Sequence, residues 1–232
     1  MSTLANFLER EGIATAVVSL VDAQSAPAAP PRVLWVPFEL GRPLGEPMDA
    51  AFQTQVLREL LALFDVPSGP VRREFEADPA RAGAAAAWAA PDLKGAVSVA
   101  DEIKALAPHH AEFLAAAGRS TVALSGLDVD ECARFVCGFE DGYRPVSESP
   151  LSDILRFRFA ADDLKAYYLE AASRGRTDAS TRQLQSWLWN ETRLGQTLVD
   201  FWRGSADCND RRRELVGGRF IVPTDWRTEL GA

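Results

Sequence analysis

The sequence predicts an α/β fold, with a small, mainly parallel sheet and flanking helices, followed by a helical C-terminal subdomain. Two near-continuous apolar runs, Ile13–Val21 and Val33–Val36, have the composition of strands buried on both faces. A Gly/Pro-rich loop and an amphipathic helix follow the second run, in the order typical of a parallel α/β unit. Beyond Pro150 the β-branched runs cease and helical periodicity takes over.

The first third contains the elements of the sheet. Gly12 is a suitable end for a helix over Leu4–Glu11. After it we expect a strand at Ile13–Val21, a linker at Ala26–Pro31, a strand at Arg32–Phe38 and a helix over Asp49–Phe64. A third strand at Pro70–Phe75 carries alternating charge, which suits the edge of a sheet.

The middle of the chain is less regular. The Ala-rich stretch Asp78–Pro91 fits either a surface helix or a loop. A helix over Val99–Ala117 ends at Gly118, and a strand is expected at Ser120–Leu124. Asp128, with Glu131 three residues later, resembles a capping box and predicts the start of another helix.

Three further helices complete the prediction, near Leu151–Ala172, Ser180–Trp202 and Asp207–Val216. We expect them to pack as a helical cap. The predicted domains are therefore an α/β domain over residues 1–145 and a cap subdomain over residues 146–232.

Composition excludes several classes of protein. The net charge of -8 disfavours a nucleic-acid-binding surface, and the basic run Arg211–Arg213 is typical of a solvated helix face. No apolar stretch is long enough to span a bilayer. The N-terminus does not resemble a signal peptide, so we expect a cytoplasmic protein.

The loop after Val33–Val36 is the best candidate binding site. It should lie at the carboxyl end of a parallel strand, where ligands bind in open α/β sheets. Its candidate ligand-binding residues are Arg42, Glu39, Gly41 and Gly45. The arginine can hold a small anion, and the glycines permit an unusual backbone path.

Two acids on apolar helix faces are candidate catalytic residues. Glu191 lies at the centre of an apolar stripe in the Ser180–Trp202 helix, and Asp162 lies on the preceding helix. A simple ion pair between Arg158 and Asp162 is the alternative. The adjacent His109 and His110 suit a surface or a helix end better than a general base.

The sequence contains no motif for a cofactor or a metal: no P-loop, dinucleotide fingerprint, serine-hydrolase elbow or metal quartet is present. Three cysteines form no disulfide framework. Cys132 and Cys137 are interpreted as small buried hydrophobes, and Cys208 as exposed.

Several segments of the first third carry a family resemblance. They are Leu8–Thr15, Pro31-Arg32, Pro43–Pro47 and the helix with Val56-Leu57 and Leu60-Leu61. In residue type, order and spacing they resemble the C-terminal part of the selenoprotein B subunit of the glycine, sarcosine, betaine and D-proline reductases. In that family the reactive selenocysteine or cysteine precedes the segment resembling Leu8–Ala14, whereas this chain has no cysteine before Cys132.

The resemblance implies a reductase-subunit-B-like protein without the family's nucleophile. Such a protein would bind a small amino-acid-derived anion, or act as a subunit of a biosynthetic or redox complex. Two alternatives stay open: a non-catalytic module that contacts a partner protein or a second copy, and an enzyme that uses Glu191 and Asp162 as acid and base.

Overall fold

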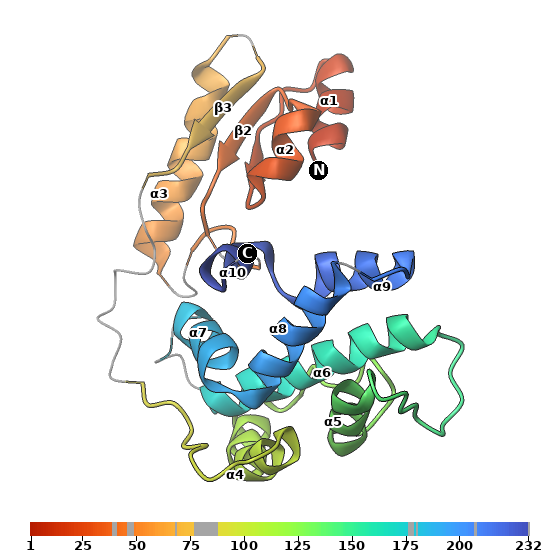
Figure 1. Cartoon of the computed structure of the whole chain (residues 1–232). Coiled ribbons are helices and arrows are strands. Elements are labelled where there is room, and N and C mark those ends of the chain that lie inside the picture. Colours follow the sequence, from red (N-terminus) through yellow and green to blue (C-terminus); the bar gives the residue numbers. More distant parts are fainter. Residues whose placement is uncertain are drawn as a thin grey trace. The chain divides into compact units, whose positions relative to one another are not determined.

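The computed structural model describes residues 1–38, 41–45, 49–67, 69–76, 88–175, 179, 181–206 and 208–231. The chain divides into two compact units, Met1–Ala84 and Ala85–Ala232 (Figure 1). Each unit has its own buried apolar cluster. The two are therefore described separately.

Unit 1 is built on a three-stranded parallel sheet. Strand β2 (Arg32–Trp35) lies between β1 (Val17–Ser19) and β3 (Val71–Glu74). Val18 pairs with Leu34, and Leu34 pairs with Arg73. The accompanying helices are α1 (Ser2–Arg10), α2 (Asp22–Ala28), α3 (Ala50–Leu61) and the 3-10 helix η1 (Ala62–Asp65). The predicted small parallel α/β fold is confirmed.

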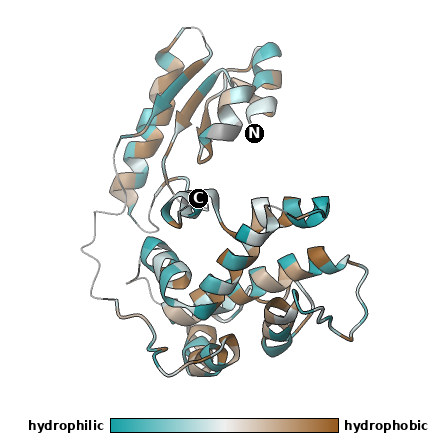
Figure 2. Ribbon diagram, viewed as in Figure 1, coloured by the Kyte–Doolittle hydropathy of each residue, from teal (hydrophilic) through white to brown (hydrophobic). Residues whose placement is uncertain are grey.

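The central strand and α3 supply most of this unit's core. Leu34 and Val36 are fully buried, as is Val56 of α3. Hydrophilic and hydrophobic residues alternate along α3 in Figure 2, as expected for an amphipathic helix. Asp49 caps α3 by accepting a hydrogen bond from the Phe52 backbone N–H at 3.0 Å.

Two expectations for unit 1 need correction. The strand predicted at Ile13–Val21 is shorter and only half-buried, because β1 is an edge strand paired on one side. The linker predicted at Ala26–Pro31 overlaps α2, and Pro27 lies in the last turn of that helix. The edge position predicted for the third strand is confirmed by β3.

Unit 2 is helical in its described residues, and α6 (Asp153–Ser173) is its central element. The others are α4 (Val99–Ala117), α5 (Val129–Gly138), α7 (Thr181–Glu191), α8 (Arg193–Ser205), α9 (Arg211–Val216), the π-helix η3 (Gly217–Ile221) and α10 (Thr224–Glu229). Helices α4 and α5 share one apolar core with α6. The chain therefore divides near residue 84, and the boundary predicted between residues 145 and 146 is wrong.

Helix ends are predicted better than the connections between helices. Gly118 ends α4 in the left-handed conformation, and Asp128 caps α5 through the Glu131 N–H, both as expected. Ser120–Leu124 forms no strand. Most of the Asp78–Pro91 stretch lies outside the described residues. No helix in the described part of the chain is long and apolar enough to cross a membrane.

The single helix predicted over Ser180–Trp202 is two helices, which meet at Thr192. The Thr192 hydroxyl caps α8 by accepting from the Gly195 N–H at 2.9 Å, and it donates to the Leu188 carbonyl at 2.7 Å. The two helices approach so closely that a Cβ atom on Gly195 would lie 2.0 Å from the Leu188 oxygen. Only glycine fits at this position.

This close approach predicts opposite effects for two alanine substitutions in α8. Gly195→Ala should destabilise the protein by about 1–3 kcal/mol, because a rigid backbone oxygen occupies the space. Gly204→Ala is the matched control, since its Cβ would meet only a flexible arginine end at 3.5 Å. There we expect stabilisation by roughly 0.5–1 kcal/mol, the ordinary helix preference. Urea unfolding measures both, and equal effects would contradict the α7–α8 geometry.

Candidate functional site

The candidate binding loop contains a tight turn that follows β2. Gly41 and Gly45 have φ values of +93° and +87°, in the left-handed region that favours glycine. The Gly45 N–H donates to the Arg42 carbonyl at 3.0 Å and closes the turn. Gly45 is buried, whereas Arg42 is half-buried. The turn thus has a defined path and carries a cationic side chain.

Three aromatic rings gather near this end of the sheet. Phe38 follows β2, Phe75 follows β3 and Phe52 lies in the first turn of α3. Their ring centroids are 5.6 Å apart in each of the three pairs. Leu44, between the two glycines, packs against the same apolar cluster. The turn is therefore anchored to the core at its leucine.

The structure brings three of the four predicted ligand-binding residues together. Gly41, Arg42 and Gly45 belong to one turn at the carboxyl end of the central strand, as expected. Glu39, the fourth, lies outside the described residues. The glycines shape the turn, so Arg42 is the residue that can recognise an anion.

At the opposite end of β2 an ion pair ties unit 1 together. Arg32 bonds Glu9 of α1 at 2.6 Å and the Val66 carbonyl at 3.2 Å. The same glutamate accepts from the Thr15 N–H at 2.8 Å and from its hydroxyl at 3.0 Å. The hydrogen bond from Arg32, followed by that from the Thr15 backbone, lowers the pKa of Glu9. This network has a structural role.

The two predicted catalytic acids lie apart. Glu191 is exposed at the end of α7, because the break at Thr192 interrupts the apolar stripe on which it was expected. It lines a cleft of 580 Å³ whose lining does not include Asp162. Asp162 pairs with Lys165 at 2.7 Å and with Arg158 at 3.7 Å, so the simple ion pair exists. The expected burial of Glu191 is wrong.

Asp163, the neighbour of Asp162, has the buried role that the sequence reasoning missed. Its carboxylate accepts hydrogen bonds from the backbone N–H groups of Ala123, Leu124 and Ser125 at 2.8–2.9 Å. The Ser125 hydroxyl adds a fourth bond at 2.6 Å. Asp163 is 1% exposed, so the charge depends on these donors.

Glu170, two helical turns after Asp163, holds the start of the same segment. It accepts from the Thr121 N–H and hydroxyl at 2.8 and 2.7 Å, from the Ser120 hydroxyl at 2.7 Å, and bonds His110 Nε2 at 2.9 Å. Burial on its own raises the pKa of Glu170, but the bonds from Ser120, Thr121 and His110 outweigh it and lower the pKa below 4.5. His110 is thus a half-buried structural partner.

Glu102 is a third buried carboxylate, on α4. It accepts from the N–H groups of Arg193 and Leu194 at 2.7 and 3.2 Å, at the start of α8, and from the Tyr168 hydroxyl at 2.9 Å. A negative charge at a helix N-terminus is stabilising. Asp163, Glu170 and Glu102 share a signal that the sequence holds: acids on otherwise apolar helix faces.

The thiols differ in their surroundings. Cys132 is fully buried, and burial raises its pKa to about 11. Cys137 is exposed, so its predicted burial is wrong, and Cys208 is half-buried rather than exposed. Within the described residues no group of three or more His, Cys, Asp or Glu side chains is placed to hold a metal ion.

The neighbouring acids Asp162 and Asp163 predict unequal effects on stability. Asp163→Asn leaves backbone donors with a poorer acceptor in a buried site, so we expect a loss of about 3 kcal/mol in the free energy of unfolding. Asp162→Asn, the control, removes only ion pairs that remain partly open to solvent and should cost about 0–1 kcal/mol. Chemical denaturation of both variants measures the difference. Similar losses would show that the segment does not depend on Asp163.

The lowered pKa of Glu170 predicts a pH-dependent stability. Ionised Glu170 favours the folded state, so its contribution is fully present above pH 4.5 and is lost as the pH falls through the folded pKa. The free energy of unfolding, measured with urea from pH 7 to pH 3, should therefore fall less steeply below pH 4.5 in Glu170→Gln than in the wild type. Parallel curves for the two proteins would contradict this role.

No protein-family model, curated protein or solved structure matches this chain. The resemblance to the reductase B subunits accordingly depends on the quoted residues, all of which belong to unit 1.

Proposed function

We propose that this protein binds a small carboxylate derived from an amino acid at the Gly41–Gly45 turn, with Arg42 as the anion-binding residue. One observation carries the proposal: Arg42 lies in a turn after the central strand of a parallel sheet. That end of such a sheet is where ligands bind. The protein would then be a reductase-subunit-B-like binding protein.

The turn is suited to present a guanidinium. Its two left-handed glycines, the bond between Gly45 and Arg42 and the packing of Leu44 all restrict the backbone on either side of the arginine. A restricted backbone lowers the entropy lost on binding. The planar fork of an arginine matches both oxygens of a carboxylate, which favours a carboxylate as the ligand.

The segments of the resemblance have different roles in unit 1. Glu9 and Thr15, in the first segment, bond to each other, and Arg32, in the second, pairs with Glu9. The resembling residues of these two segments therefore stabilise the amino end of β2, and this structural role accounts for their resemblance. Arg42 and Pro43 follow the carboxyl end of β2, whereas that network lies at its amino end, and we infer a role in binding for the loop from this position.

Binding is favoured over cleavage because two thiols lack the setting of a nucleophile. The chemistry of the reductases needs a readily ionised selenolate or thiolate. Burial raises the pKa of Cys132, and desolvation by neighbouring atoms raises the pKa of Cys137 although its residue is exposed, which disfavours both thiolates at neutral pH. The third thiol, Cys208, donates to the Ser205 carbonyl at 3.2 Å. The proposal therefore assigns recognition of the carboxylate, and no bond cleavage, to this protein.

Calorimetric titration of N-methylated glycines, with acetate as a minimal carboxylate, tests the proposal. We expect Arg42→Ala to weaken binding by about tenfold or more, since a charge-assisted bidentate contact is lost. Arg42→Lys should bind with intermediate affinity, because it keeps the charge without the fork. Arg58→Ala, an exposed arginine on α3, is the matched control and should bind as the wild type does.

Two outcomes would overturn the proposal. One is the absence of saturable binding by the folded wild-type protein, as judged by its circular dichroism. The other is equal affinity in the wild type and Arg42→Ala, which would place the ligand elsewhere. A loss in Arg58→Ala as large as that in Arg42→Ala would indicate a general effect of net charge.

A further inference from the structure

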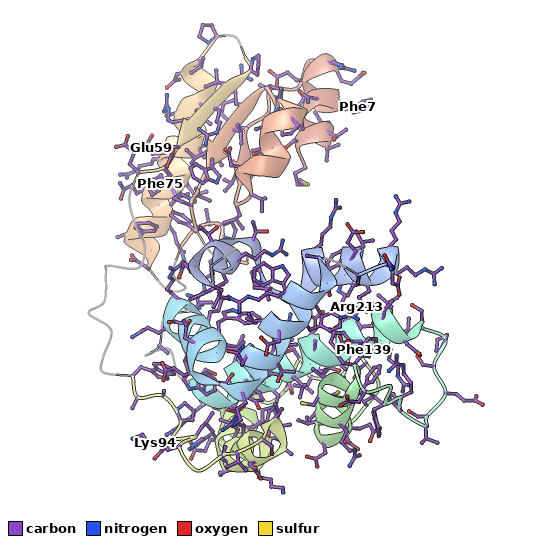
Figure 3. The ribbon with its side chains drawn as sticks, in the orientation of Figure 1. Phe7, Glu59, Phe75, Lys94, Phe139 and Arg213 are labelled. Carbon is purple, nitrogen blue, oxygen red and sulfur yellow. The ribbon has the colours of Figure 1, made fainter. Side chains whose placement is uncertain are left out.

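Unit 2 contains a second concave surface with converging arginines. A cleft of 750 Å³ lies between the end of α5, the start of α6 and the segment that leads into α9. Arg144, Arg212 and Arg213 line it from two places far apart in the sequence. Figure 3 labels Arg213 and Phe139, two of the residues that line this cleft. Its volume lies within the range of small-ligand sites, about 300–1,000 Å³.

Two of the arginines are held in place by acids. Arg213 pairs with Glu140 at 2.6 Å and lies over the Phe201 ring at 5.2 Å. Arg144 pairs with Asp153 at 2.8 Å and donates to the Tyr143 carbonyl at 2.6 Å. Each pair fixes a guanidinium at the cleft and offsets the charge of its acid. Such preorganised arginines are typical of oxyanion sites.

Arg212 supplies the guanidinium that has no partner among the described residues. Its side chain is exposed and makes no hydrogen bond or ion pair with any residue that the structure describes. The nearby Asp210 is already engaged, because it accepts from the backbone N–H groups of Arg212 and Arg213 at 2.8 and 3.3 Å. The cleft thus presents a guanidinium whose N–H donors have no acceptor among the described residues, and Asp210 is held by backbone bonds instead of pairing with it.

Ser152 adds a neutral donor beside these arginines. It precedes α6, yet its side chain makes no capping hydrogen bond, so the hydroxyl remains able to donate to a ligand. Guanidinium and hydroxyl donors around one concave surface favour a ligand with several acceptor oxygens. An apolar ligand would leave these donors without acceptors, at a cost in free energy.

We propose that this cleft binds a small molecule through an oxyanion, either a phosphoryl or a carboxylate group. Arg212 contacts the anion directly, while the paired Arg144 and Arg213 form the fixed walls. The site is separate from the Arg42 turn, because all its lining residues belong to unit 2. The inference therefore goes beyond the function proposed for unit 1.

A thiol in the cleft provides a local probe. Cys208 lines the cleft, whereas Cys137 lines a different one and serves as the internal control. The experiment alkylates the full-length protein with iodoacetamide and follows both cysteines by peptide mass spectrometry. Inorganic phosphate and succinate are titrated separately at constant ionic strength. We expect one of them to slow modification of Cys208 saturably, with Cys137 unaffected.

Two arginine variants test the assignment. Arg212→Gln should raise the anion concentration for half-protection of Cys208 by about tenfold, because its fork is lost. Arg219→Gln, an exposed arginine that lines a different groove, should behave as the wild type does. Neither side chain has a partner in the described structure, so both variants should fold.

The protection of Cys208 identifies the class of ligand and tests the proposal. Protection by phosphate alone identifies a phosphoryl ligand, and protection by succinate alone identifies a carboxylate ligand. The proposal is overturned if neither anion protects Cys208, if both cysteines are protected equally, or if the two arginine variants weaken protection to the same extent. Because the readout is local to the cleft, failure here leaves the Arg42 proposal untouched.

Discussion

The organisation of unit 2 depends on two carboxylates on one face of α6. Asp163 and Glu170, seven residues apart, each accept four hydrogen bonds from the segment over residues 120–125 or from His110. This segment forms no strand, so its backbone donors depend on those acids. An unsatisfied buried donor would cost about 1–3 kcal/mol, so the two acids stabilise the path of the chain between α4 and α5.

That path determines where α5 lies, and with it one wall of the arginine cleft. The segment leads directly into α5, which packs against α6 through Cys132, Phe135 and Val136. Phe139, just beyond α5, lines the cleft and packs against Phe157 of α6, with the ring centroids 4.5 Å apart and the rings tilted by 53°. Buried acids far from the cleft thus position an aromatic wall and the turn that carries Arg144. The placement of Arg144 at the cleft therefore depends on buried contacts that do not line the cleft.

Much of the fold follows from local patterns, and the exceptions have a shared cause. The apolar run Val33–Val36 and the caps at Asp128 and Gly118 act within a few residues, so the sequence predicts them. Ser120–Leu124 has the composition of a strand, but carboxylates some 40 or more residues later in the chain take its backbone donors. Likewise, the cap formed by Thr192 divides the helix that the apolar stripe over Ser180–Trp202 predicts. Glu191 then lies at the end of α7 and is exposed. Polar contacts between residues far apart in the sequence cannot be predicted from the spacing of residues within one segment.

The same distinction separates the two candidate sites. The Gly41–Gly45 turn was predictable because a strand, a loop and a helix follow one another in the chain, and its glycines reveal the backbone path. The cleft is assembled from Arg144, Ser152 and Arg212, which no local motif links. Arg212 belongs to the basic run Arg211–Arg213, which is typical of a solvated helix face. Only the tertiary structure brings it to the same cleft as the start of α6. The binding role proposed for Arg212 therefore depends on tertiary contacts, which gather three arginines at one cleft and leave the guanidinium donors of Arg212 unpaired among the described residues.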